Sequence, residues 1–319
     1  MQTDPDFEEN FQELLAAPWK ERELVDFSVI DSLESIDLAK LALAHRRMNE
    51  AAESLISRRP AASPVFDQCI IHCKWGDIYL NGQGEQSIQD YVLSVDFGGN
   101  DHYADTTAED FKEHQWIKTI IDLDGSDRYG GEGRQIAAAV LSLNLIYDLR
   151  GDDTYSSSNN GVASALLGAA AIYDAEGNDR YSCSTDFSVA AARFGVAYIY
   201  DLAGDDRYLS GNYSQGFASA MGSGLLLDFE GDDYYGSKGE NQYSFMQGAS
   251  RGRWAQATDG HNLGGGFGVL LDFAGNDQYL AKSFSQASSY YAGLGILHDA
   301  SGDDKYDALS HSQGYAAHY

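Results

Sequence analysis

An octapeptide of the form Asp-x-x-Gly-[Asp/Asn/Ser]-Asp-x-Tyr occurs eight times in this 319-residue chain. The first Asp, the Gly, the second Asp and the Tyr are identical in all eight copies. A fixed period of this size is the signature of a repeat array, in which each unit buries its apolar face only against its neighbours. The copies begin at Asp96, Asp122, Asp148, Asp174, Asp201, Asp228, Asp272 and Asp299, spaced by 26 or 27 residues except for one interval of 44.

Each copy combines the signals of a strand and a tight corner. A short apolar run such as Leu225-Leu226-Leu227 precedes the first Asp, which indicates a strand. The Gly suits a corner with positive φ, and the Tyr begins the next strand. A unit of 26 or 27 residues matches one rung of a three-sided parallel β-helix, whereas a propeller blade takes about 40 to 50 residues.

We therefore predict a mostly β fold, a parallel β-solenoid of about nine rungs with an N-terminal α-helical cap. The ninth rung is a degenerate copy that we place at Trp75-Gly76-Asp77-Ile78-Tyr79. Gln215, Gln286 and Gln313 each follow a repeat Tyr by seven residues, and Gln135 and Gln247 follow one at six and twelve. We expect their amides to stack along the rod, with a glycan-binding row as the alternative.

The chain divides into a helical segment, residues 1–64, and a repeat domain, residues 65–319. Residues 8–58 contain no Gly, and their apolar residues are spaced as in amphipathic helices. A solenoid needs its end rung covered, so we expect these helices to cap the first rung; a separate docking module is the alternative. At the other end only thirteen residues follow Tyr306, and we expect further chain or a partner there.

The acidity of the chain narrows the function classes. The net charge is −28, and residues 65–319 hold 36 of the 49 acidic residues but only 14 of the 21 basic ones. Binding to nucleic acid or to an anionic membrane surface is therefore disfavoured. No apolar stretch has the length of a membrane span, and the acidic N-terminus is no signal peptide. We expect an extracellular or cell-surface protein whose signal is absent from this chain, with a cytoplasmic location as the alternative.

Stacking the repeats places like charges side by side. Two carboxylates about 4.8 Å apart repel by about 0.9 kcal/mol in water and about 3.5 kcal/mol at an effective dielectric constant of 20. Hydration, the basic neighbours Arg128, Arg180, Arg207 and Lys305, or a row of Ca²⁺ ions would compensate. The candidate metal ligands are Asp96, Asp101, Asp122, Asp127, Asp148, Asp153, Asp174, Asp179, Asp201, Asp206, Asp228, Asp233, Asp272, Asp277, Asp299 and Asp304.

The repeats resemble two classes of protein. Turns such as Gly125-Ser126-Asp127 resemble the calcium turns of RTX-type parallel β-rolls, although the period is longer and Tyr replaces the aliphatic residue. That resemblance implies calcium in the turns. The region from about Trp75 resembles an uncharacterised class of bacterial repeat proteins, through Leu226-Leu227-Asp228 and Ser214-Gln215-Gly216. The second resemblance implies a solenoid and no particular activity.

The repeat is interrupted once, by an insertion at about residues 236–262. Insertions in solenoids form loops on one face, often the binding face. Arg binds carboxylate or sulfate, Trp stacks on sugars and His acts as a general base. The candidate ligand-binding residues are Arg251, Arg253, Trp254, Asp259 and His261, of which Arg251, Arg253 and His261 are also the catalytic candidates. The alternative is a loop whose Arg residues pair with neighbouring aspartates.

Three functions follow from these features. The first is a structural, adhesive or glycan-binding solenoid, stiffened by Ca²⁺ along the Asp turns, with an anionic glycan or a protein as its partner. The second is a β-helix lyase or hydrolase that acts on an anionic polysaccharide through the insertion. The third is a docking scaffold that works through the N-terminal helices. The regular repeats and the lack of a defined catalytic set favour the first, and the sequence leaves open whether the protein is an enzyme.

Overall fold

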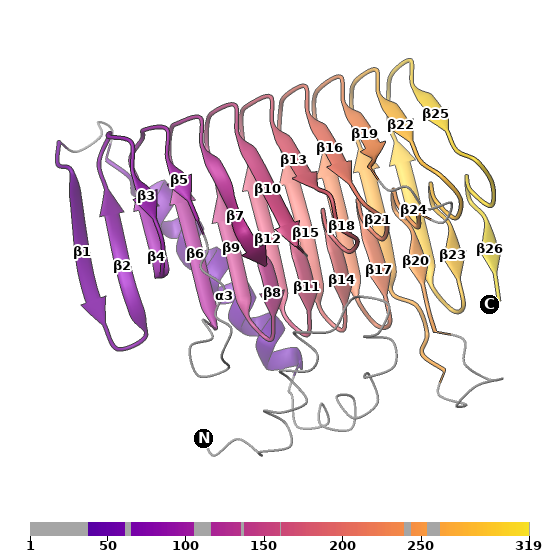
Figure 1. The fold of residues 1–319 in the computed structure, drawn as a ribbon, viewed down its shortest axis with the longest axis horizontal. Helices are drawn as coiled ribbons and strands as arrows, with labels where there is room; N and C mark the ends of the chain where they lie inside the picture. Colours follow the sequence, from indigo (N-terminus) through magenta and orange to yellow (C-terminus); the bar gives the residue numbers. More distant parts are fainter. Residues whose placement is uncertain are drawn as a thin grey trace.

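The computed structural model describes residues 38–60, 65–104, 116–134, 137–159, 161–238, 244–253 and 262–318. These residues form a parallel β-solenoid of three sheets, which confirms the predicted fold class (Figure 1). Within each sheet neighbouring strands come from successive rungs and pair in parallel, except for the antiparallel pair at the N-terminal end. Among the described residues no helix has the length and apolar composition of a membrane span.

Sheet A has ten strands, and all but the first two end at the first Asp of a repeat or next to it. Its apolar residues stack on their equivalents, as in the pair Ile172 and Ile199. In spatial order its strands are β1 (Gln68–Cys73), β2 (Gly76–Asn81), β4 (Tyr91–Asp96), β6 (Ile117–Asp122), β9 (Leu143–Tyr147), β12 (Ala169–Asp174), β15 (Val196–Asp201), β18 (Ser223–Asp228), β21 (Phe267–Asp272) and β24 (Leu294–Asp299).

Sheet B follows the Asp turn and carries the repeat Tyr at the second position of its longer strands. It has nine strands: β3 (Ser87–Ile88), β5 (His102–Tyr103), β7 (Arg128–Arg134), β10 (Thr154–Asn159), β13 (Arg180–Cys183), β16 (Arg207–Ser210), β19 (Tyr234–Ser237), β22 (Gln278–Leu280) and β25 (Lys305–Asp307). Sheet C closes the rung with seven short strands: β8 (Ala138–Val140), β11 (Ser164–Leu166), β14 (Ala191–Arg193), β17 (Phe217–Ser219), β20 (Ser250–Arg251), β23 (Ser289–Tyr290) and β26 (Ala316–Ala317).

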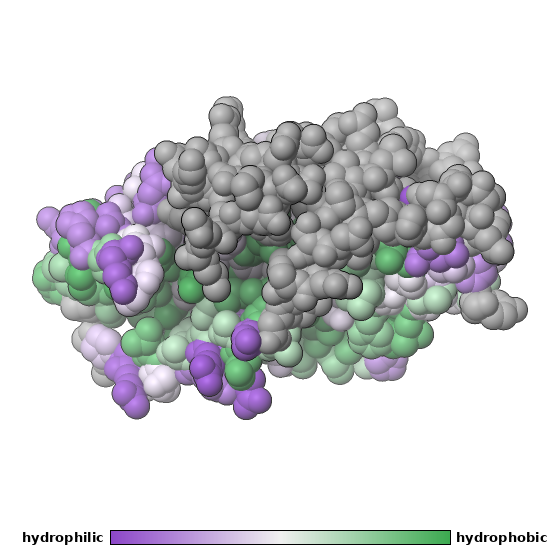
Figure 2. Space-filling model, turned by 90° about the horizontal axis from the view of Figure 1, so that it is seen from below, coloured by the Kyte–Doolittle hydropathy of each residue, from purple (hydrophilic) through white to green (hydrophobic). Residues whose placement is uncertain are grey.

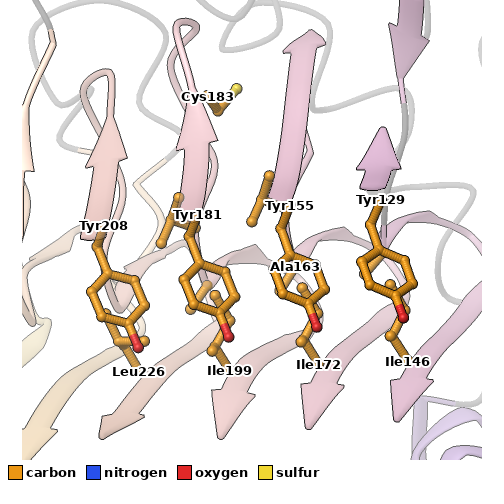
Figure 3. Packing of buried hydrophobic residues seen from close by; sticks show 14 of the residues in the cluster. Tyr129, Ile146, Tyr155, Ala163, Ile172, Tyr181, Cys183, Ile199, Tyr208 and Leu226 are labelled. Carbon is orange, nitrogen blue, oxygen red and sulfur yellow. The ribbon is translucent and has the colours of Figure 1, made fainter. Parts of the chain in front are cut away.

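The core is a stack of tyrosines facing a stack of aliphatic side chains (Figure 3). The rings of Tyr155, Tyr181 and Tyr208 are fully buried and nearly parallel, with centroids 4.7 and 4.8 Å apart. Ile172 and Ile199 of sheet A lie opposite them (Figure 3). Like residues therefore pack on like residues from rung to rung, which is why the four identical positions recur in every copy.

The corner glycine is required for space in all eight repeats and for its positive φ in six of them. Gly151 has φ +146°, as predicted, but Gly177 is not among the glycines with positive φ. A Cβ on Gly177 would lie only 1.7 Å from the carbonyl oxygen of Gly151 in the preceding rung. The rungs approach so closely at this corner that no side chain fits. The prediction of a left-handed corner at Gly177 was therefore wrong.

The degenerate ninth copy lies elsewhere than predicted. Asn81 pairs with Asp96, the Gln86 amide donates to Asp101 Oδ1 and Ile88 pairs with Tyr103. The first rung therefore carries its turn at residues 81–88, with amides in place of both aspartates. Trp75 to Tyr79 instead lie at the β1–β2 connection and within β2. The prediction failed because Gly76-Asp77-Ile78-Tyr79 matches the motif letters by chance.

Helix α3 (Leu38–Ser57) runs obliquely along sheet A (Figure 1). Its residues Met48, Ala52 and Ile56 pack against Leu145 and Tyr147 of that sheet. Asn49 Nδ2 also donates to the hydroxyl of Tyr198 at 2.7 Å. This helix lies on the side of the solenoid, and strand β1 flanks the first parallel rung. The other predicted helical residues, before Leu38, lie outside the described residues.

The edge at which sheet C passes into sheet A carries exposed apolar side chains. Hydrophobic residues occupy much of the described surface when the rod is viewed from below (Figure 2). The large exposed apolar residues along the edge are Ile117, Val196, Met221, Phe267 and Leu294.

The last rung is also open, since Leu294 is 52% and Tyr306 41% exposed. The prediction that further chain or a partner covers this end stays a prediction.

Candidate metal centre

The strand-end aspartates, the first Asp of each repeat, end the sheet A strands or directly follow them. Asp174 illustrates their position: it is 1% exposed, and its Oδ2 accepts a hydrogen bond of 2.6 Å from the hydroxyl of Tyr155 in the preceding rung. Tyr181 binds Asp201 in the same way at 2.7 Å. The repeat Tyr is therefore bound to the repeat Asp of the next rung, which couples consecutive rungs through a buried polar contact.

The turn aspartates, the second Asp of each repeat, form a parallel column. The Asp153 amide donates to Asp179 Oδ1 at 2.6 Å, and the Asp179 amide donates to Asp206 Oδ1 at 2.6 Å. The other carboxylate oxygen, Oδ2, has no hydrogen-bond partner although it is buried. Seven turn aspartates share this unpartnered oxygen: Asp101, Asp127, Asp153, Asp179, Asp206, Asp233 and Asp277.

The two columns together, here called the aspartate ladder, bring carboxylates into groups of three. Seven such groups occur among the described residues. In the five from Asp96 to Asp228, two consecutive strand-end aspartates and one turn aspartate place an oxygen within 4.8 Å of the others, and each strand-end aspartate between the first and the last is shared by two groups. These five triads are Asp96/Asp101/Asp122, Asp122/Asp127/Asp148, Asp148/Asp153/Asp174, Asp174/Asp179/Asp201 and Asp201/Asp206/Asp228.

Neither water nor a basic side chain compensates this charge. The ladder aspartates from Asp96 to Asp277 are at most 2% exposed. Arg128, Arg180 and Arg207 are exposed, and Arg207 lies over the ring of Tyr234 at 4.7 Å. No Lys, Arg or His of the described residues forms an ion pair with a ladder aspartate. Two of the three predicted compensations are therefore wrong, because the carboxylates point inward and the Arg side chains outward.

Burial makes the charged form of these carboxyls unfavourable. Burial, and next the charge of Asp122, raises the pKa of Asp96 to about 8. Burial raises the pKa of Asp272 to about 6, and that of Asp153 to about 9. Without a cation, part of the ladder therefore holds protons near neutral pH. Carboxylate oxygens, here crowded and partly unpartnered, are the type of ligand that Ca²⁺ binds, six to eight at a time.

The predicted ligand-binding loop is only partly described. Arg251 belongs to strand β20, paired with Ser219 and Tyr290 of the neighbouring rungs, so it lies in the rung and not in a loop. Arg253 forms an isolated antiparallel bridge with Leu263. Trp254, Asp259 and His261 lie outside the described residues, so their place beside the two Arg residues is untested.

An aromatic environment around Arg251 was not predicted. Its Nη1 donates to the Tyr213 hydroxyl at 2.9 Å, and its guanidinium lies 5.6 Å from the ring centre of Tyr213 and 5.5 Å from that of Phe245. Tyr213 and Phe245 come from successive rungs at equivalent corners. Their recurrence two residues before Gln215 and Gln247 is the sequence signal that could have found this contact.

The glutamines do not stack on one another as predicted. Gln215 Nε2 donates to the Tyr208 carbonyl of its own rung and to the Gly236 carbonyl of the next, both at 2.9 Å. Gln286 makes the same pair of contacts with Tyr279 and Asp307. Each amide therefore ties two backbones together, and the buried carbonyls near it explain why its nitrogen points there. Gln135 lies outside the described residues.

Comparison of the chain with protein-family models, curated proteins and solved structures found no match.

Proposed function

We propose that this protein is a structural scaffold whose aspartate ladder holds a row of divalent cations, with Ca²⁺ as the ion. The observation that carries the proposal is the unpartnered, buried oxygen of seven turn aspartates, of which the five from Asp101 to Asp206 each belong to a triad of carboxylates. A buried carboxylate is costly unless it is paired, protonated or bound to metal. No basic partner is present among the described residues, which leaves protons and cations.

The charge balance favours divalent ions. Each rung contributes two carboxylates to the ladder, so one Ca²⁺ per rung would neutralise it. The residues that would hold an ion are the three aspartates of a triad, such as Asp174, Asp179 and Asp201. Ca²⁺ prefers oxygen ligands and tolerates irregular geometry, whereas Mg²⁺ demands a near-ideal octahedron and gives up its water reluctantly, which disfavours it among buried carboxylates.

The scaffold would act by holding its outer surfaces in a fixed array. Because consecutive rungs are joined through the Tyr–Asp contacts and the ions, removal of the ions would loosen the whole rod. Calcium sites of extracellular modules bind in the range of about 10⁻⁴ to 10⁻³ M, so an extracellular or cell-surface location fits this role. An adhesive function then depends on a ligand-binding surface elsewhere on the rod.

Thermal unfolding tests the proposal directly. A ligand that binds only the folded state stabilises it by RT ln(1 + [L]/Kd), about 2.7 kcal/mol per site at one hundred times Kd. At pH 7.5 we expect the melting temperature to rise with millimolar CaCl₂ and to fall with EDTA. KCl of matched ionic strength is the control for screening. Equal melting in EDTA, CaCl₂ and KCl would reject the cation row and leave protonation as the explanation of the ladder.

A further inference from the structure

Between the aspartate turns that begin at Asp228, Asp272 and Asp299, the described residues carry basic side chains and no acidic ones. Residues 236–238, 244–253, 262–271 and 279–295 contain Lys238, Arg251, Arg253 and Lys282 and no Asp or Glu. The chain as a whole has 49 acidic residues and 21 basic ones. Positive charge gathered on one part of an acidic rod attracts anions to that part, whereas the acidic remainder of the rod repels them.

A column of aromatic rings runs through the same region. Tyr213, Phe245, Phe284 and His311 occupy equivalent corners of four successive rungs, with ring centroids 5.6, 5.0 and 4.8 Å apart. Phe245 is buried, Tyr213 and Phe284 are half-buried, and His311 is exposed. The rings stack face to face along the rod, so the accessible parts of Tyr213, Phe284 and His311 are ring edges, which carry partial positive charge. The column therefore suits an anionic ligand better than the face of a neutral sugar.

Arg251 and Lys282 join the charge to the column. The Arg251 guanidinium lies over the rings of Tyr213 and Phe245. The backbone amide of Lys282 donates to Ser244 Oγ at 3.1 Å, which places Lys282 beside the residue that precedes Phe245. A guanidinium held on aromatic rings is ordered before a ligand arrives, which lowers the entropy lost on binding.

We propose that this aromatic–basic strip, formed by Tyr213, Phe245, Phe284, His311, Arg251 and Lys282, binds an anionic polysaccharide that carries carboxylate or sulfate groups. The inference rests on the scaffold role proposed above, since the strip exists only while rungs of the rod stay in register. The rings repeat along the rod axis, whereas Arg251 has Ser219 and Tyr290 at the equivalent positions of the neighbouring rungs. The strip therefore offers a polymer a repeating aromatic edge beside a single guanidinium. Arg251 would bind the anion, and the ring edges would line its path.

Calorimetric titration at one fixed CaCl₂ concentration tests this assignment with polygalacturonate and dextran sulfate, and with neutral dextran as the control polymer. We expect at least one anionic polymer to bind and dextran not to bind. Arg251→Gln should weaken binding about tenfold, the effect of losing about 1.4 kcal/mol. Lys282→Gln should also weaken it. Arg207→Gln should leave it unchanged, because Arg207 is likewise stacked on a tyrosine, but on sheet B.

Several outcomes would overturn the assignment. No binding of either anionic polymer would do so, as would equal losses in Arg251→Gln and Arg207→Gln, which would indicate unspecific attraction. Tight binding of polyglutamate without polysaccharide binding would indicate an acidic protein partner instead. Melting curves show whether each variant folds. If Arg251→Gln does not fold, Lys282→Gln serves as the second probe of the strip. The melting response to CaCl₂ separates failure of this surface from failure of the scaffold proposal.

Discussion

Removal of cations should make the stability of this protein fall as the pH rises. The ladder carboxyls from Asp96 to Asp277 have folded-state pKa values above 3.8, the ordinary value, because they are buried. The folded protein therefore keeps protons that the unfolded chain releases between pH 3.8 and the folded pKa. By linkage, their contribution is complete below about pH 4 and is lost as the pH rises through the folded pKa.

The magnitude of this pH-dependent loss of stability can be worked out for a single carboxyl. For Asp272 the pKa rises from 3.8 to about 6, which corresponds to about 3 kcal/mol between acid and neutral pH. Neighbouring carboxyls repel each other less once one is protonated. The total loss of stability is therefore smaller than the sum of the losses calculated for each carboxyl alone. A loss of even about 3 kcal/mol is a large part of a typical stability of 5–15 kcal/mol and lowers the melting temperature by roughly 5 °C or more.

The assay is thermal unfolding between pH 4.5 and 8, in EDTA and in CaCl₂. In EDTA we expect the melting temperature to fall across this range, and in CaCl₂ the fall should be smaller because the ion replaces the proton. Burial raises the pKa of Asp206 to about 10, so at pH 8 without cations this side chain must take up a proton when the chain folds. Asp206→Asn needs no proton and should raise stability in EDTA, but it lacks the carboxylate for a cation and should lower stability in CaCl₂. Asp205→Asn, one residue away and exposed, is the matched control and should do neither. A melting temperature that rises with pH in EDTA would refute the reasoning.

Two further substitutions test the packing of the ladder. Tyr181→Phe keeps the stacked ring but removes the hydroxyl that binds Asp201, and it should lower the free energy of unfolding by about 2 kcal/mol in denaturant titrations. The control Tyr200→Phe, on the outside of sheet A, should change this free energy by less than about 0.5 kcal/mol. Equal effects of the two substitutions would contradict the role of the Tyr181 hydroxyl. Gly177→Val should lower the free energy of unfolding by about 2 kcal/mol or more, because the new Cβ would meet the Gly151 carbonyl. The control Ala175→Val should be tolerated. Similar melting temperatures of both variants would show that the corner has room for a side chain.

The sequence predicted the architecture because the repeat itself encodes it. Apolar runs before each Asp, a corner glycine and a period of 26 or 27 residues give strand, turn and rung length, and the order of the strands follows from the repeat. The first rung was misplaced because Asn81, Gln86 and Ile88 share few letters with the motif. They occupy its positions only through their pairing with the next rung.

The sequence does not show in which direction the aspartates point. An Asp beside a glycine corner is equally compatible with an exposed turn, and only the folded rung shows that Asp174 and Asp179 face inward. The Tyr–Asp contact joins residues 19 or 20 positions apart in most rungs, too far for local spacing to reveal. Arg251 was assigned to a loop because the insertion surrounds it, whereas its backbone pairs with strands on both sides.

The central claim is that divalent cations neutralise the aspartate ladder, and equilibrium dialysis against CaCl₂ at pH 7.5 with elemental analysis of the protein tests it most directly. With seven triads among the described residues, we expect close to seven calcium ions per chain at saturation. We also expect fewer in Asp206→Asn and no change in Asp205→Asn. Less than one bound ion per chain at millimolar calcium, with the protein folded, would contradict the account.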